Sequence, residues 1–216
     1  MRILFIRHGE PDYEKDDLTD TGIRQAQFLA QRLKDEDIEE IWSSPLGRAK
    51  RTADISSEFL GIPVRTLEFM REIRWGSING EPVFAGGHPW DIADEMAKRG
   101  MDLTYNEWQT NQFFRNNKVV GAVSEVQEGI DKWLSEFGYV RNGLYYDHMT
   151  QEENHKTIAL FCHGGSSSAA IGRIMNLPFP YVCAMLHMEY TGITVIRLDK
   201  RKGSCTLPSV EKITGR

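Results

Sequence analysis

Short apolar segments alternate along this chain with longer ones in which hydrophobic residues recur every three or four positions, a pattern typical of strands alternating with helices. Strands are predicted at 3–6, 38–42, 64–67, 157–162 and 193–198, and near an edge at 204–207. Helices are predicted from 19 or 21 to 33, over 47–60 with a left-handed cap at Gly61, from 123 to 137 and over 165–175. The alternation predicts an α/β fold in three layers, with a mostly parallel sheet flanked by helices.

Residues 80 to about 119 interrupt this alternation with prolines, paired glycines and many aromatic side chains. The aromatic residues are Phe84, Trp90, Tyr105, Trp108, Phe113 and Phe114. We expect a mostly helical insertion here, within a single domain spanning 1–216. The polar stretch 141–155 is predicted to be a loop, with Asp147, Glu152 and Glu153 in solvent.

Composition narrows the classes of function. The net charge is -5, from 26 basic and 31 acidic side chains, which argues against bulk nucleic-acid binding. No segment approaches the roughly 20 apolar residues of a membrane span, and the apolar run at the N-terminus is short for a signal peptide, so a cytoplasmic location is expected. Cys162, Cys183 and Cys205 lack metal-binding spacing and are expected to be buried, reduced thiols.

Two histidines end apolar strands in the same local sequence, His-Gly. His8 follows the strand at 3–6, and His163 follows the strand at 157–162. Parallel strands of an open sheet deliver the residues at their carboxyl ends into a common crevice, so the two side chains are expected to lie together. Arg7 ends the first strand, where a buried guanidinium needs an anion.

A phosphate-binding site is predicted at the start of the helix over 47–60. Arg48 lies in its first turn, and free backbone N–H groups with a guanidinium suit a phosphate. A neutral imidazole among cations has a free lone pair, as phosphoryl transfer to histidine requires. Glu72, in a polar turn, is the candidate proton donor, although an ion pair with Arg71 or Arg74 is the alternative.

Several motifs occur in the order found in one family. They are Arg7-His8-Gly9-Glu10, Leu18-Thr19-Asp20-Thr21-Gly22, the segment 43–53 from Ser43-Ser44-Pro45 to Thr52-Ala53, Glu72-Ile73-Arg74-Trp75-Gly76 and Cys162-His163-Gly164-Gly165. Over about residues 1 to 198 the chain thus resembles the histidine phosphatase superfamily, the phosphoglycerate mutase-like family.

The resemblance implies a role for each matching residue. His8 would be phosphorylated, Arg7, Arg48 and His163 would bind the phosphoryl group, and Glu72 would donate and recover a proton. Tyr13 and Gly164 are added as substrate contacts. The family fold carries a variable helical insertion over the active site, which matches 80–119, and no cofactor or metal is implied.

Departures from the mutase pattern favour a phosphomonoester hydrolase. Pro11-Asp12-Tyr13-Glu14 replaces the expected Ser-x-Trp-Asn continuation, and Glu72-Ile73-Arg74-Trp75-Gly76 replaces Glu-Arg-x-Tyr-Gly. A mutase and a non-catalytic phospholigand-binding protein remain the alternatives. The expected partner is a phosphorylated small molecule, with a homodimer left open and neither nucleic acid nor membrane expected. An aromatic insertion would suit a substrate with an organic body.

Overall fold

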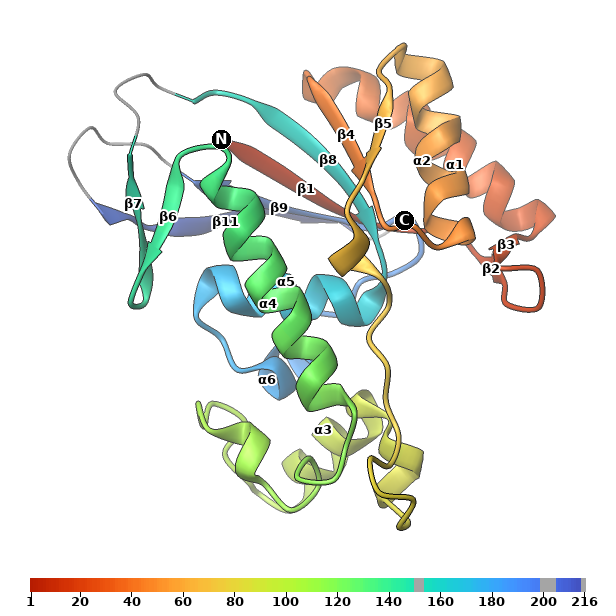
Figure 1. The fold of residues 1–216 in the computed structure, drawn as a ribbon. Coiled ribbons are helices and arrows are strands. Elements are labelled where there is room, and N and C mark those ends of the chain that lie inside the picture. The colour runs from red at the N-terminus through yellow and green to blue at the C-terminus, as the bar shows by residue number, and fades with distance from the viewer. Residues whose placement is uncertain (150–153, 199–204, 215–216) are drawn as a thin grey trace.

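A six-stranded mixed sheet forms the centre of the protein (Figure 1). The computed structural model describes residues 1–149, 154–198 and 205–214. The strand order is β11 (Pro208–Thr214), β9 (Ile193–Leu198), β1 (Arg2–Arg7), β8 (Thr157–Cys162), β4 (Glu40–Ser43) and β5 (Val64–Thr66). The strands from β1 to β5 in this order are parallel, and β9 is antiparallel to both of its neighbours, β1 and β11. The predicted mostly parallel sheet is confirmed.

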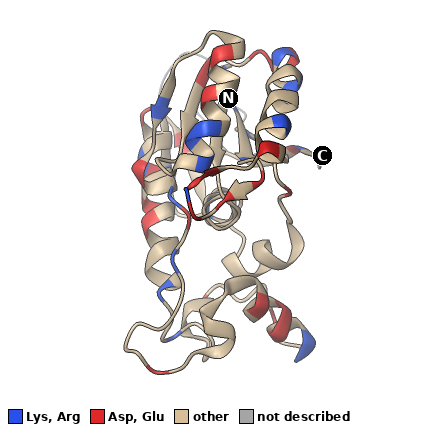
Figure 2. Cartoon of the chain, turned by 90° about the vertical axis from the view of Figure 1, so that its right-hand side faces the viewer, with Lys and Arg blue, Asp and Glu red and all other residues tan. Residues whose placement is uncertain are grey.

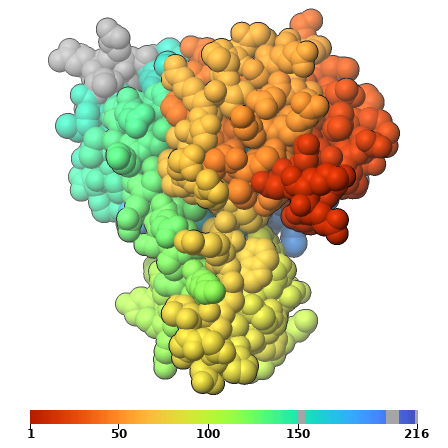
Figure 3. Space-filling view, turned by 45° about the vertical axis from the view of Figure 1, so that its right-hand side comes forward, coloured from red at the N-terminus to blue at the C-terminus, as the bar shows by residue number. Residues whose placement is uncertain are grey.

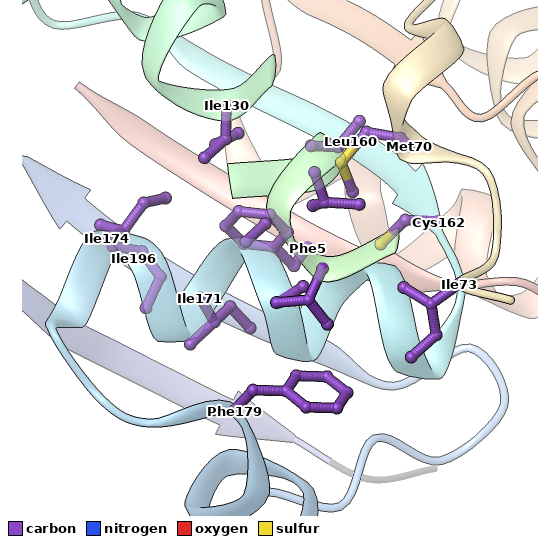
Figure 4. Close-up of a cluster of buried hydrophobic side chains, with 14 of the residues drawn as sticks. Phe5, Met70, Ile73, Ile130, Leu160, Cys162, Ile171, Ile174, Phe179 and Ile196 are labelled. Carbon is purple, nitrogen blue, oxygen red and sulfur yellow. The ribbon is translucent and has the colours of Figure 1, made fainter. Parts of the chain in front are cut away.

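Helices cover both faces of the sheet. Because successive side chains of a strand point to opposite faces, β1 contributes to a hydrophobic core on each side. Leu4 and Ile6 pack with residues of α1 (Asp20–Leu33) and α2 (Gly47–Leu60). Ile3 and Phe5 lie in the larger core with residues of α4 (Val119–Ser135), α5 (Gly164–Met175) and α6 (Phe179–Met185). Figure 4 shows Phe5 among side chains from α5 and the neighbouring strands. The three predicted layers are therefore present.

Local signals in the sequence explain where the helices begin and end. Thr19 accepts a hydrogen bond from the backbone N of Gly22 at 3.0 Å and caps α1. α2 ends at Gly61, whose φ of 72° is left-handed, as predicted. The strands predicted at 157–162 and 193–198 have the observed bounds.

The prediction of a loop over 141–155 is wrong for its first part. A hairpin joins β6 (Tyr139–Asn142) to β7 (Tyr145–His148) through a turn at Gly143, whose φ is 59°. Asn142 pairs with Tyr145, so the two-residue loop is Gly143-Leu144. A glycine at the first loop position between β-prone residues is a hairpin signal, and the polar composition hid it. Asp147 accepts a hydrogen bond from Asn142 at 2.8 Å. Glu152 and Glu153 lie outside the described residues.

The chain's last strands also differ from prediction. Residue 204 lies outside the described part, and β10 (Cys205–Thr206) pairs with β7 in a small second sheet instead of adding to the main one. β11 and α6 were not predicted, because β11 is largely exposed and α6 is only seven residues long. Cys162 and Cys183 are free and buried, as expected, whereas the Cys205 side chain is outside the described part.

The insertion at 80–119 forms a lobe below the sheet (Figures 1 and 3) and is less helical than predicted. Its regular elements are α3 (Pro89–Lys98) and two 3-10 turns, η3 (Phe84–Gly87) and η4 (Trp108–Thr110). Gly86, Gly87 and Gly100 have left-handed φ values that interrupt longer helices. Trp108 packs against Phe114 at 4.8 Å and against Phe179 of α6 at 5.5 Å between ring centroids, so part of the aromatic set joins the lobe to the larger core.

The remaining short elements surround the central sheet. They are β2 (Pro11–Asp12), β3 (Asp17–Leu18), η1 (Lys34–Glu36) and η2 (Glu68–Met70). Figure 2 shows basic and acidic residues interspersed over this side of the molecule. Among the described residues, no helix has the length and apolar character needed to cross a membrane, and no group of three or more His, Cys, Asp or Glu is arranged to hold a metal ion.

Candidate active site

His8 and His163 lie together at the carboxyl ends of two neighbouring parallel strands. β1 and β8 pair in register with Arg7 opposite Cys162, and the backbone N of His8 donates to the Cys162 carbonyl at 3.1 Å. The ring centroids are 5.1 Å apart, and both side chains are buried. The structure thus brings the two histidines into one place, as the sequence predicted.

The hydrogen bonds of His8 fix its tautomer. Its Nδ1 lies 2.7 Å from the carbonyl oxygen of Gly9, which can only accept, so Nδ1 carries the proton. Its Nε2 then accepts from Nε of Arg48 at 3.3 Å. Burial, together with the charges of Arg48 and Arg7, lowers the pKa of His8 from 6.5 to about 3, against the opposing hydrogen bond to Gly9. The imidazole is therefore neutral at pH 7, with an unprotonated Nε2.

Arg7 lies beside His8 with part of its donor capacity unused. Its Nη1 donates to the carbonyl of Met188 at 2.6 Å, and its guanidinium carbon lies 4.3 Å from the centroid of the Tyr190 ring. Its Nε is buried and has no hydrogen-bond partner among the residues the structure describes. A buried, unsatisfied donor costs about 1–3 kcal/mol, which an anion bound beside it would recover.

Arg48 lies in the first turn of α2, but a side chain of the protein already occupies part of the phosphate-binding site predicted there. The carboxylate of Asp16 accepts from Nη1 of Arg48 at 2.6 Å and from the backbone N of Gly47 at 2.7 Å. The prediction that helix amides are free for phosphate is therefore wrong for Gly47. A negative side chain satisfies the helix N-terminus in the usual way. The Nε of Arg48 still donates to Nε2 of His8.

Ser44 holds the second histidine. Its Oγ lies 2.7 Å from Nε2 of His163 and also accepts from the backbone N of Leu46 at 3.2 Å. Burial lowers the pKa of His163 well below its usual value, and the neighbouring His8 and arginines lower it further. His163 therefore stands as a neutral, oriented polar group next to His8.

The carboxyl group of Glu72 lies against the N-terminus of α5, the helix that begins directly after His163. Its Oε1 accepts from the backbone N of Ile73 at 2.9 Å and of Ser166 at 3.0 Å, and its Oε2 accepts from Gly165 at 3.3 Å. Burial raises the pKa of Glu72, and these three amide hydrogen bonds oppose the increase. The three backbone amides therefore hold the Glu72 carboxyl group in place. The alternative ion pair with Arg71 or Arg74 is not formed, since Arg71 pairs with Glu68 and Arg74 pairs with Glu125.

Aromatic side chains surround the two arginines. The centroid of the Tyr13 ring lies 5.5 Å from the guanidinium carbon of Arg48. The ring centroids of Tyr190 and His8 are 5.8 Å apart. A Cβ on Gly164 would lie 3.3 Å from Trp90 of the insertion and 3.9 Å from Arg7. Gly164 therefore lies between the insertion and the arginine, and the insertion contributes to the site.

Sequence reasoning did not identify Asp16, Ser44, Tyr190 or Trp90 as parts of the site. Ser44 lies inside a motif that was noticed, so its place next to a predicted helix start was an available signal. Tyr190 comes from the segment between α6 and β9, where the sequence carries no signal of function. His88 packs between Trp75 and Trp90, with 5.3 and 5.2 Å between ring centroids.

The family comparison agrees with this geometry. The sequence profile of the histidine phosphatase superfamily (branch 1) matches residues 3–210, nearly the whole chain. The chain belongs to the histidine phosphatase superfamily. The resemblance seen in its motifs is thereby confirmed, and the superfamily includes proteins described as phosphatases and as phosphoglycerate mutases.

Similar members of the superfamily carry both descriptions. The chain is 30% identical over 191 residues to a 2,3-bisphosphoglycerate-dependent phosphoglycerate mutase of Thermoplasma acidophilum, covering 81% of this chain and 90% of that protein. It is 30% identical over 135 residues to the uncharacterized phosphatase PhoE of Bacillus subtilis, covering 58% of this chain and 64% of that one. A mycobacterial glucosyl-3-phosphoglycerate phosphatase has the same fold, with a TM-score of 0.66, 22% identity and coverage of 97% and 96%.

Proposed function

We propose that this histidine phosphatase superfamily member is a phosphomonoester hydrolase that forms a phosphohistidine on Nε2 of His8. The observation that carries the proposal is the position of that nitrogen. It is unprotonated and buried, it faces Arg48, and Arg7 beside it has a buried N–H without a partner among the described residues. A neutral nucleophile between two guanidiniums suits attack on a phosphoryl group.

The reaction has two balanced steps. First, the lone pair of Nε2 attacks phosphorus, the bond from phosphorus to the ester oxygen breaks, and that oxygen takes the proton of Glu72. Second, water attacks phosphorus, the bond to Nε2 breaks, and the carboxylate of Glu72 takes the proton of the water. The guanidiniums of Arg7 and Arg48 and the imidazole of His163 hold the equatorial phosphoryl oxygens in both steps.

The environment of Glu72 supports its role as proton donor. Burial keeps its pKa above the usual range, so a larger share of the carboxyl is protonated near neutral pH. Within the described part of the chain, Oε2 accepts one hydrogen bond, at 3.3 Å, whereas Oε1 accepts two shorter ones. The proton therefore belongs on Oε2, and Oε1 anchors the group.

A phosphorylated small molecule with an organic body is the proposed substrate. Tyr13, Tyr190 and Trp90 surround the cationic groups and offer ring faces to the part of the substrate that leaves.

Phosphoglycerate mutase activity is the second candidate, and the 30% identity to the mutase of Thermoplasma acidophilum favours it. A mutase returns the phosphoryl group of His8 to another hydroxyl of the substrate instead of to water. Measuring inorganic phosphate release and phosphoglycerate isomerisation in the same samples separates the two. Isomerisation much faster than phosphate release would replace the proposed hydrolase.

Trapping the intermediate tests the proposal directly. The protein is mixed with a labelled aryl phosphate, denatured within milliseconds in alkali, and assayed for acid-labile, base-stable label. We expect label on the wild type and none on His8→Ala. His187→Ala, a change in an exposed histidine, is the matched control and should retain it. Turnover by His8→Ala would overturn the role of His8 as nucleophile. Absence of turnover in the wild type across a panel of phosphomonoesters would overturn the proposal and leave the non-catalytic binding alternative.

A further inference from the structure

The carboxylate of Asp16 occupies two donors at the start of α2. Its Oδ2 lies 2.7 Å from the backbone N of Gly47, and its Oδ1 lies 2.6 Å from Nη1 of Arg48. The side chain of Asp16 is 42% exposed, while that of Arg48 is 11% exposed. A phosphoryl group that meets Arg48 therefore finds one end of the guanidinium already held by the protein.

The backbone around this contact is shaped to allow it. Asp16 has a φ of 49°, a left-handed conformation that only a few non-glycine residues adopt. A Cβ on Gly47 would lie 1.9 Å from the carbonyl oxygen of Asp16, so only glycine lets the turn between β2 and β3 approach α2 this closely. Asp12 closes the same turn by accepting from the backbone N of Glu14 at 3.1 Å. Figure 3 shows the red N-terminal segment lying against the orange surface that contains α2.

This contact determines the orientation of Arg48. The guanidinium is planar, so fixing the directions of Nη1 and Nε fixes the plane and the directions of the remaining N–H groups. Nη1 is fixed by Asp16, and Nε lies 3.3 Å from Nε2 of His8. Without Asp16, the flexible side chain of Arg48 would have only the weaker contact with a neutral imidazole to orient it.

We propose that Asp16 is a positioning residue that holds Arg48 in line with Nε2 of His8, and this inference rests on the proposed function. Because Asp16 places a negative charge next to the phosphate-binding site, it improves alignment at the expense of ground-state anion affinity. Its loss should therefore lower kcat without weakening phosphate binding, which a merely structural role does not predict.

Two substitutions at Asp16 retain the turn. Asn and Gly both accept the left-handed conformation, so Asp16→Asn and Asp16→Gly should fold. Asp17→Asn is the matched control, because Asp17 lies in the same hairpin and its carboxylate accepts from its neighbour Leu18 at 2.7 Å. Each change at Asp16 is combined with Arg48→Ala, and kcat, KM, the thermal midpoint and the Kd of inorganic phosphate by calorimetry are measured.

We expect Asp16→Asn and Asp16→Gly to lower kcat about 10- to 100-fold in the wild-type background and less than about 3-fold in Arg48→Ala, with a phosphate Kd that is unchanged or lower. An equal loss in both backgrounds, an unchanged kcat, or a phosphate Kd raised together with a lower thermal midpoint would overturn the inference. Failure of the proposed function is distinguishable, because it appears as absent turnover or absent phosphohistidine in the wild type.

Discussion

The Nε of Arg48 lies 3.3 Å from Nε2 of His8, although 40 positions separate the two residues. The other ring nitrogen contacts the Gly9 carbonyl at 2.7 Å. Both ring nitrogens of His8 are thus hydrogen-bonded to groups of the protein, Nδ1 as a donor and Nε2 as an acceptor. Because Nε2 is already unprotonated, attack on a phosphoryl group needs no separate base.

The lowered pKa of His8 predicts a loss of stability in acid. The native state keeps His8 neutral down to about pH 3, while the unfolded chain protonates it below 6.5. Stability should therefore be fully present above pH 6.5 and fall as the pH drops toward 3. For His8→Asn, the loss between pH 7 and 4.5 should be smaller by on the order of 2 kcal/mol, measured by urea unfolding. Parallel pH profiles for the two proteins would contradict this.

Glu72→Gln should reveal the proton donor through the leaving group. We expect rates on alkyl phosphates, whose leaving oxygen needs a proton, to fall by roughly two to four orders of magnitude. Aryl phosphates, with good leaving groups, should lose much less. The measurement is kcat/KM on a series of esters of graded leaving-group pKa.

The control for that series is Glu68→Gln. Glu68 lies four residues earlier, and its exposed side chain pairs with Arg71 at 3.1 Å. Exposed pairs of this kind contribute about 0–1 kcal/mol, so activity should be unchanged on every ester. Equal losses on alkyl and aryl substrates in Glu72→Gln would exclude Glu72 as the donor.

The sequence predicted the parts of the site that depend on topology. Apolar runs before His8 and His163 indicated parallel strands, and such strands end at one edge of the sheet. Helix signals at Gly47 and Gly61 placed Arg48 in a first turn, where the structure has it. These inferences needed only local periodicity and capping, which a single chain carries explicitly.

Contacts made by loops across the fold could not be predicted in this way. Asp16 reaches Arg48 only because a left-handed residue turns the β2–β3 hairpin toward α2, and nothing in its neighbours specifies that rotation. Glu72 reaches the amide of Ser166, 94 positions away, from a segment without regular structure. Tertiary packing, not local preference, determines such contacts.

Ser44→Ala should impair turnover through His163. The substitution leaves the buried Nε2 of His163 without its partner at 2.7 Å, which should cost about 1–2 kcal/mol of stability and roughly 10-fold in kcat/KM. Ser43→Ala is the matched control, because that buried hydroxyl donates to the Ser44 carbonyl at 2.9 Å and not to a histidine. Equal activity losses in the two variants would show that Ser44 matters for stability alone.

Gly165→Ala should displace the proton donor without altering its chemistry. A Cβ at this position would lie 2.6 Å from Oε1 of Glu72 and 2.3 Å from Cγ1 of Ile73, so the carboxyl group must move from the α5 amides. We expect stability to fall by about 1–3 kcal/mol from overpacking, and kcat on alkyl phosphates to fall roughly 100-fold, with a smaller loss on aryl phosphates.

Gly121→Ala supplies the comparison for Gly165→Ala. Gly121 lies within α4, and a Cβ there meets nothing within 4 Å, so this variant should gain up to about 1 kcal/mol from helix propensity and keep wild-type activity. Thermal unfolding and kcat on paired alkyl and aryl esters measure both effects. If Gly165→Ala lost activity equally on both ester classes, the damage would lie in phosphoryl binding, and the contact between Glu72 and α5 would not serve proton transfer.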